Sequence, residues 1–274
     1  MIGYRKDLCI DKVVLVTGGR SGIGFGIAKL FLELGATVFI CSRKAELLQK
    51  ACEDLSAYGK CLSKVCDIRK EEEINALAEF INAEAGKLDI LVNNAGGQFP
   101  TLAEDVSTNG WNAVINNNLN GTFYMIKQMF NSFFKPQLNG TIVNITANVH
   151  RGFPGMVHTG AARAGVENLT KTLALEWAKY KVRINAVAPG TIQSSGLDTY
   201  DPNIQKTLEA GRKANLMKRF GTVEDIANTV IFLSSPMSSY ISGITIYVDG
   251  LDHLAQNNMA FIDVLENMKK QMKQ

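Results

Sequence analysis

The sequence predicts an α/β fold, in which a doubly wound, mainly seven-stranded parallel sheet carries helices on both faces. Three observations predict it. Short runs rich in β-branched residues alternate with longer segments of helical period along the 274-residue chain. Most of these short runs are nearly continuously apolar, as strands covered on both faces must be. A glycine-rich turn at residues 17–24 separates the first of these strands from the first helix.

The first half of the chain contains strand and helix signals in regular succession. The first strand, at 13–16, reads Val-Val-Leu-Val, and further short runs at 37–41, 64–66 and 90–93 are predicted strands. The spacing of apolar residues predicts helices at 22–34, 44–57 and 70–85. Right-handed crossovers through these helices bring the carboxyl ends of the strands to one edge of the sheet, where ligands bind.

The second half continues the alternation with longer elements. Strands are predicted at 141–146, 183–187 and 245–248, and helices at 107–134, 159–180 and 223–234. No repeat or linker interrupts them, so residues 1–274 are expected to form one domain. The irregular stretch 191–220 follows a strand end and is expected to contact substrate; the alternative is a surface connection with its own helices.

The tail at 251–274 is predicted to be helical. Phe261, Leu265, Met268 and Met272 fall on one stripe of this helix. The stripe either packs against this domain or a neighbouring subunit, or covers a bound ligand.

The composition excludes several classes of function. A net charge of +3 is too small to predict nucleic-acid binding, and no run reaches the roughly 18 apolar residues that a membrane helix needs. The five cysteines form no Cys-x-x-Cys pair, and the three histidines lie far from them. We therefore expect neither a disulfide framework nor a metal site. Without a signal-peptide pattern, the expected location is the cytoplasm.

The turn after the first predicted strand has the features of a pyrophosphate site. Glycines allow a sharp turn and close approach of the backbone, and the next helix offers N-terminal amides and its positive dipole end to an anion. The spacing differs from the strict Gly-x-Gly-x-x-Gly pattern, but its place between strand and helix predicts dinucleotide binding in a Rossmann-type sheet. The expected contacts are Gly18, Arg20, Ser21, Gly22, Ile23 and Gly24.

The end of the second predicted strand indicates which dinucleotide binds. An NAD site usually has an acidic residue there for the ribose 2′-hydroxyl, whereas an NADP site has cations for the 2′-phosphate. This chain has Ser42, Arg43 and Lys44 and no acid, and Arg20 is expected nearby. Guanidinium suits phosphate, so we expect NADP(H) with Ser42 and Arg43 as contacts. Alternatively, Arg43 and Lys44 only begin a solvated helix face.

Several motifs, in this order, resemble the short-chain dehydrogenase/reductase family from about residue 11 to residue 250. They are the glycine turn, Asp67, the Asn-Asn-Ala-Gly segment at 93–96, Asn118 and Pro189-Gly190. The resemblance implies that Asp67 and Ile68 flank the adenine, and that Pro189, Gly190, Thr191 and Ile192 meet the nicotinamide end. It also implies cofactor contacts from Asn94, Ala95, Gly96, Asn118, Thr146 and Arg163, and assembly as a dimer or tetramer.

The sequence departs from this family where its catalytic Tyr-x-x-x-Lys is expected. Alignment of the flanking residues places Thr159 at the tyrosine and Arg163 at the lysine, and the family serine falls on Thr146 or Ala147. A threonine hydroxyl is too weak an acid to replace the tyrosine, and arginine keeps its charge but does not deprotonate. Alcohol dehydrogenation by the usual family route is therefore disfavoured.

Reduction of a conjugated double bond suits these residues better. Hydride adds to the β-carbon of an enoyl thioester, and hydrogen-bond donors stabilise the enolate oxygen. Residues 152–171 are similar to peroxisomal trans-2-enoyl-CoA reductases and, less closely, to 2,4-dienoyl-CoA reductases, which have a tyrosine where this chain has Asn148. We expect an NADPH-dependent reductase that reduces the 2,3 double bond of a trans-2-enoyl thioester, a small-molecule substrate, with catalytic residues Asn118, Thr146, Thr159 and Arg163.

Two other hypotheses stay open at this level. One is a carbonyl or alcohol oxidoreductase with an atypical proton relay through His158 or water, because histidine titrates near neutral pH. The other is an NADP-binding protein without turnover. In neither case do we expect a nucleic-acid or membrane partner. The basic residues Arg212, Lys213 and Lys218 either meet coenzyme A phosphates or are simply solvated.

Overall fold

The computed structural model describes residues 4–194 and 201–254. Seven strands form one sheet in the order β3-β2-β1-β4-β5-β6-β9, and every neighbouring pair is parallel. The direction of winding changes between β1 and β4, so the two halves of the chain build outward from the centre of the sheet. The predicted doubly wound α/β fold is confirmed.

The strands form at the expected apolar runs, with one shift. They are β1 (Val13–Thr17), β2 (Thr37–Ser42), β3 (Cys61–Val65), β4 (Ile90–Asn93), β5 (Gly140–Ile145), β6 (Val182–Pro189) and β9 (Thr245–Val248). The strand predicted at 64–66 begins earlier, because Cys61 already pairs with Val38 of β2. As the edge strand, β3 is only partly buried, and its apolar signal in the sequence is correspondingly weak.

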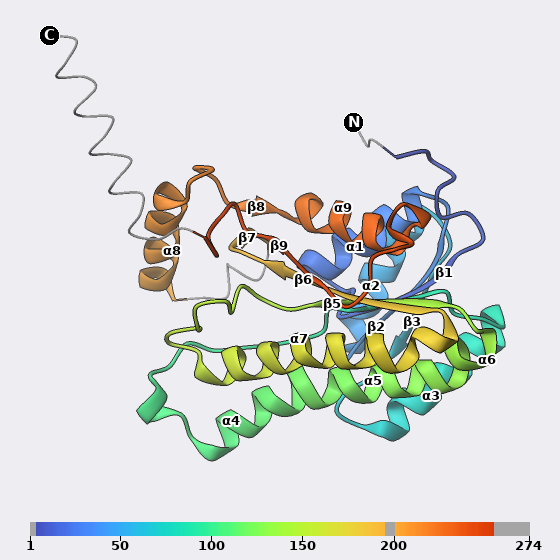
Figure 1. Cartoon of the computed structure of the whole chain (residues 1–274), viewed down its shortest axis with the longest axis horizontal. Coiled ribbons are helices and arrows are strands. Elements are labelled where there is room, and N and C mark those ends of the chain that lie inside the picture. The colour runs from blue at the N-terminus through green and yellow to red at the C-terminus, as the bar shows by residue number, and fades with distance from the viewer. Residues whose placement is uncertain (1–3, 195–200, 255–274) are drawn as a thin grey trace, which may run out of the picture.

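Helices cover both faces of the sheet (Figure 1). They are α1 (Gly22–Glu33), α2 (Ala45–Ser56), α3 (Glu71–Ala85), α4 (Thr108–Ile115), α5 (Gly121–Met129), α6 (Lys135–Gln137), α7 (Val157–Trp177), α8 (Pro202–Ala214) and α9 (Val223–Ser234). The helix predicted at 107–134 is a rod of α4, α5 and α6, joined by π-helical segments at Asn116–Asn120 and Phe130–Phe134. Such segments change which side chains share a face, and a regular helical period does not reveal them.

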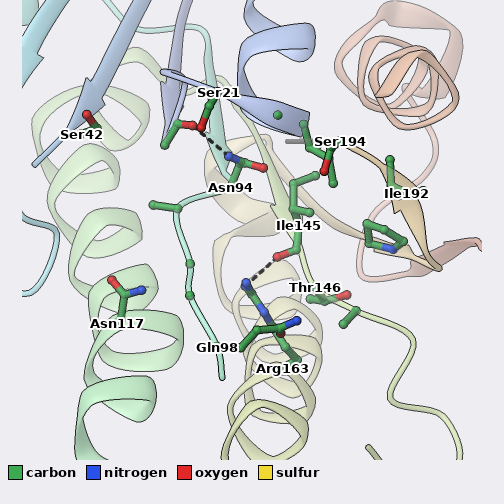
Figure 2. A pocket seen from close by; sticks show the side chains of 18 of the residues that line it. Ser21, Ser42, Asn94, Gln98, Asn117, Ile145, Thr146, Arg163, Ile192 and Ser194 are labelled. Carbon is green, nitrogen blue, oxygen red and sulfur yellow. Dashed lines mark hydrogen bonds between the residues drawn. The ribbon is translucent and has the colours of Figure 1, made fainter. Parts of the chain in front are cut away.

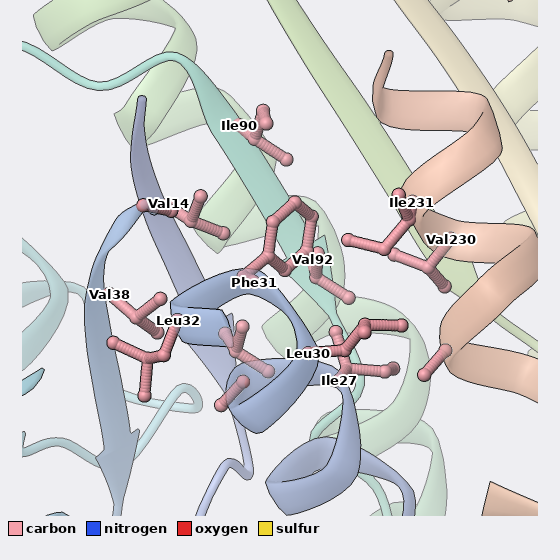
Figure 3. Packing of buried hydrophobic residues seen from close by; sticks show 14 of the residues in the cluster. Val14, Ile27, Leu30, Phe31, Leu32, Val38, Ile90, Val92, Val230 and Ile231 are labelled. Atoms are coloured by element: carbon pink, nitrogen blue, oxygen red, sulfur yellow. The ribbon is translucent and has the colours of Figure 1, made fainter. Parts of the chain in front are cut away.

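Two hydrophobic clusters lie on the two faces of the sheet. Val14 and Val16 of β1 belong to one cluster and Val13 and Leu15 to the other, as the alternation of side chains along a strand requires. In the first cluster, the fully buried Phe31 of α1 packs among strand residues and the side chains of α9 (Figure 3). The clusters fix the strand ends, and therefore the residues that follow them.

The stretch at 191–220 is more regular than expected. It contains β7 (Ile192–Gln193), which pairs in parallel with β8 (Gly221–Thr222) in a small second sheet, and α8. Residues 195–200 lie outside the described part of the chain, as does the predicted apolar stripe of Phe261, Leu265, Met268 and Met272. Within the described residues, no helix has both the length and the hydropathy to cross a membrane.

Candidate active site

The carboxyl ends of the central strands open into a cavity of about 650 Å³, a size typical of small-molecule sites. The predicted cofactor residues that line it are Gly18, Arg20, Ser21, Gly22, Ile23, Ser42, Arg43, Asp67, Ile68, Asn94, Ala95, Gly96, Thr146, Arg163, Pro189, Gly190, Thr191 and Ile192. Gly24 and Asn118 are not on its wall. The structure therefore brings nearly all of the predicted positions together, and their contact with a dinucleotide stays a prediction.

The glycine turn is held in place by the segment that follows β4. The Asn94 side-chain amide donates to the Thr17 carbonyl at 3.0 Å, and the Thr17 hydroxyl accepts from the backbone amides of Asn94 and Ala95 at 3.0 and 2.9 Å. Gly18 has a φ of +66°, and a Cβ there would lie 3.0 Å from Cα of Ala95. A Cβ at Gly24 would lie 2.5 Å from the Gly18 carbonyl oxygen, so Gly24 serves the packing of α1.

One end of the cavity carries cations and an unpaired hydroxyl. Arg20 and Arg43 line it, and the Ser42 hydroxyl oxygen is buried with no hydrogen-bond partner among the described residues. The acid in this region, Asp67, is held by Arg69, with 2.5 Å between Nη2 and Oδ2. The guanidinium holds the pKa of Asp67 below its usual value. The cations and the orphaned hydroxyl fit a ribose that bears a phosphate.

Arg163 lies in the cavity wall as a buried cation. The residue is 9% exposed, and its Nη1 donates to the Ile145 carbonyl at 2.8 Å (Figure 2). Its Nη2 lies so close to Gly96 that a Cβ there would displace the guanidinium. Burial lowers the pKa of Arg163 to about 10, so the side chain stays charged at neutral pH. No carboxylate among the described residues forms an ion pair with it, which makes this part of the cavity positive.

Two predicted catalytic residues do not reach the cavity wall. Asn118 is fully buried and holds Gly97 by both backbone groups, accepting from its amide at 2.9 Å and donating to its carbonyl at 3.0 Å. Thr159 is fully buried in the first turn of α7. Thr159 and Arg163 are four residues apart and share a helix face, but only the longer side chain lines the cavity. Thr146 lines it as predicted.

His158 also lies outside the cavity wall. Its ring is fully buried, 4.5 Å from the ring of Phe99 between centroids, and burial lowers its pKa. Nδ1 accepts the backbone proton of Thr159 at 2.7 Å, so the neutral ring carries its own proton on Nε2. The imidazole is therefore not placed to contact a molecule in the cavity.

Several lining residues are missing from the predicted set. They include Gln98, Pro100, Asn117, Asn148, Phe153, Met156, Leu208 and Asp252. Asn148 lies two residues after the strand predicted at 141–146 and Gln98 five residues after the one at 90–93, so closeness to a strand end was a usable signal. Leu208 belongs to α8, inside the stretch 191–220 that was expected to contact substrate, but no motif singled out this residue. The apolar members Pro100, Phe153, Met156 and Leu208 give the cavity a hydrophobic part beside its charged part.

Comparison with known proteins agrees with the geometry. The family model described as enoyl-(acyl carrier protein) reductase matches residues 18–250. The peroxisomal 2,4-dienoyl-CoA reductase of Rattus norvegicus is 38% identical over 252 residues, covering 90% of this chain and 85% of that protein. The 3-oxoacyl-acyl-carrier-protein reductase FabG of Chlamydia muridarum is 38% identical, covering 89% of this chain and 98% of that protein.

A solved structure gives the same result. A short chain dehydrogenase from Bacillus anthracis superposes with a TM-score of 0.85 at 39% identity, covering 90% of this chain and 99% of that chain. The sequence motifs, the sheet order and these relatives all agree. The chain therefore belongs to the short-chain dehydrogenase/reductase family, whose members bind a nicotinamide cofactor, and it is an oxidoreductase related to the dienoyl-CoA reductases.

Proposed function

We propose that the protein uses NADPH to reduce the 2,3 double bond of a trans-2-enoyl thioester. The observation that carries this proposal is Arg163, a buried cation in the cavity wall, combined with Thr159, which is withdrawn from that wall. Alcohol–ketone chemistry needs an acid at the carbinol oxygen, and neither residue supplies one. A reaction that places negative charge on a thioester oxygen instead gains from a fixed, desolvated cation.

The chain's own residues suit NADPH. Gly18 and Gly22 have φ values of +66° and +56°, which let the backbone turn under a pyrophosphate at the start of α1. Arg20, Ser42 and Arg43 would hold the 2′-phosphate. Hydride is what the reduced nicotinamide supplies when it is bound.

The rest of the cavity suits an acyl thioester. The wall formed by Pro100, Phe153, Met156 and Leu208 suits an alkyl chain. Gln98 and Arg163 line the polar part, so we assign to them the hydrogen bonds to the thioester oxygen. The side-chain amide of Asn118 is hydrogen-bonded to the backbone of Gly97, so we assign to Asn118 the role of holding the segment that carries Gln98.

A 2,4-dienoyl-CoA is a second candidate substrate, because one relative is named a 2,4-dienoyl-CoA reductase. Those enzymes have a tyrosine at the position that Asn148 occupies in this chain. Asn148 lies in the cavity wall. Its amide donates to Asp249 at 3.0 Å and to Asp252 at 3.1 Å. An amide does not release a proton, so a dienoyl substrate would require another proton donor.

The test is oxidation of NADPH in the presence of a medium-chain trans-2-enoyl-CoA. NADH, a 2,4-dienoyl-CoA, a 3-oxoacyl thioester and a simple ketone are run in parallel. Fast oxidation with the enoyl-CoA, and slow oxidation with the carbonyl compounds, is the expected result. A preference for the dienoyl-CoA would select the second candidate. Turnover of the ketone or the 3-oxoacyl thioester alone would overturn the proposal, and binding of NADPH without any turnover would leave a non-catalytic role.

A further inference from the structure

A carboxyl group lies directly behind the Thr146 side chain. Thr146 follows β5 and lines the cavity. Its hydroxyl oxygen lies 3.5 Å from Oε1 of Glu167 and 3.2 Å from the carbonyl oxygen of Val187. Glu167 stands one helical turn after Arg163 on α7 and is not itself part of the cavity wall. Thr146 therefore connects the cavity to a titratable group outside it.

The surroundings of Glu167 favour its neutral form. Partial burial raises its pKa, and this effect exceeds the opposing effects of Lys171 on the same helix, the Thr146 hydroxyl and His150 after β5. Tyr247 of β9 also faces this group, because the carboxylate helps to raise the pKa of its phenol. A carboxyl group that keeps its proton closer to neutral pH is a suitable general acid.

Three other polar groups at or near the cavity, Arg163, Asn148 and His158, are poorly suited to donate this proton. Arg163, with a pKa of about 10, holds its proton too firmly at neutral pH. Asn148 is an amide, and the His158 ring lies outside the wall. The Thr146 hydroxyl alone is too weak an acid, but it can pass a proton on if it receives one at the same time.

On the basis of the proposed function, we propose that Glu167 supplies, through the Thr146 hydroxyl, the proton that the substrate's α-carbon takes up. Hydride, with its electron pair, forms the new C–H bond at the β-carbon, and the electrons of the double bond move onto the thioester as an enolate. As the carbonyl re-forms, the α-carbon takes the proton of Thr146, while Thr146 takes that of Glu167. The Glu167 carboxylate is then reprotonated from solvent, so each turnover consumes one solvent proton.

In this scheme Thr146 touches the substrate and is a catalytic residue, whereas Glu167 acts through it. The pH dependence has a defined sign, because Glu167 must be protonated to donate. The kcat of the wild-type enzyme falls as pH rises through the raised pKa of Glu167. A carboxyl group with a purely structural role would not produce this limb of the profile.

The kinetic test compares matched variants at Glu167. Glu167→Gln keeps the shape and a hydrogen-bonding oxygen but has no acidic proton. We expect it to lower kcat about 100-fold, the low end for loss of a general acid, to abolish the descending limb, and to leave KM and the NADPH Kd unchanged. Glu167→Asp should retain the limb. Glu176→Gln, on the exposed end of the same helix, is the control and should match the wild type.

A second readout needs neither substrate nor cofactor. Isotope-edited infrared spectroscopy of the wild type should show one glutamate carboxyl with a raised pKa, absent in Glu167→Gln. Thr146→Val, which removes the hydroxyl and keeps the shape, should raise this pKa further, because the hydroxyl lowers it. Thr146→Ser should restore both the pKa and the kcat.

The outcomes separate this role from the proposed function. If the wild type reduces an enoyl-CoA but Glu167→Gln has the same kcat and pH profile, the role of Glu167 is wrong and the function stands. If Thr146→Val leaves the carboxyl pKa unchanged, the proposed link through Thr146 is wrong. If the wild type does not reduce the thioester at all, the function fails, and the role fails with it.

Discussion

At position 163, a buried guanidinium takes the place of the lysine expected from the family pattern. Desolvation lowers the pKa of Arg163 to about 10. The charged form therefore costs the folded state its full free-energy penalty at every pH below that value, and the penalty shrinks as pH rises from about 10 toward the ordinary arginine pKa. The hydrogen bond to Ile145 offsets only part of the cost. A buried cation at a cavity wall, with no ion-pair partner among the described residues, is a candidate for interaction with a negatively charged ligand.

Replacing Arg163 separates its catalytic value from its cost. Arg163→Met should lower kcat/KM for the enoyl thioester about 100-fold, the scale of losing one oxyanion donor, while stability to urea at neutral pH stays equal or increases. Arg163→Lys keeps the positive charge but replaces the planar guanidinium with a shorter ammonium side chain. Its kcat/KM should lie between the values of the wild type and Arg163→Met. A destabilised Arg163→Met protein with normal kcat/KM would contradict this interpretation.

The cations near Ser42 should decide between the two nicotinamide cofactors. Arg43→Ser removes a cation from the cavity wall, and we expect the Kd for NADPH to rise about tenfold, the scale of one hydrogen bond to a charged group. The Kd for NADH should not change. Lys50→Ser on the exposed face of α2 removes the same charge away from the cavity and serves as the control. Fluorescence titration measures both dissociation constants. An equal rise in the Kd for NADPH and for NADH would refute the assignment of Arg43 to the 2′-phosphate.

At the scale of elements, the sequence predicted the strands and their ends well, because a parallel strand buried on both faces leaves an apolar run. Residues placed by a strand end, such as Gly18, Asp67 and Asn94, were predicted to lie at the cavity and do so. Residues placed by a helix were predicted less well. Asn118 lies in a π-helical segment, where helical periodicity fails, and Thr159 has the right face of α7 but too short a side chain.

The packing of α1 on the sheet should contribute strongly to stability. Phe31 is fully buried in the cluster between the sheet, α1 and α9. Phe31→Ala should lower the free energy of unfolding by about 3–5 kcal/mol. Leu47→Ala, at an α2 side chain that is 46% exposed, should change it by less than about 0.5 kcal/mol. Urea denaturation measures the free energy of unfolding of both variants. A similar decrease in the two would mean that burial of Phe31 in this cluster does not contribute the expected stability.

At the scale of the whole molecule, the cavity joins the two halves of the sheet. The glycine turn and Arg43 come from the first half, whereas Arg163 and Ile192 come from the second. A dinucleotide that spans this cavity binds only when both halves are correctly placed. Its binding free energy is then added to the stability of the whole fold.

This linkage predicts a thermal shift that depends on the cofactor. NADPH at about 100 times its Kd should stabilise the fold by about 2.7 kcal/mol, which corresponds to a rise in Tm of about 5 °C or more for a chain of this size. NADH at the same concentration should give a smaller rise. Differential scanning calorimetry measures both, and a larger shift with NADH would reverse the cofactor assignment.

The contact between α1 and α9 has a consequence for synthesis on the ribosome. A Cβ at Gly26 of α1 would collide with Val223 of α9, so the two helices meet at close range. About 190 residues lie between the end of α1 at Glu33 and the start of α9 at Val223. While the chain is being translated, the apolar face of α1 therefore emerges long before its partner exists. Nascent chains that pause before α9 expose this face, and exposed apolar surface of this kind favours aggregation of incompletely synthesised chains.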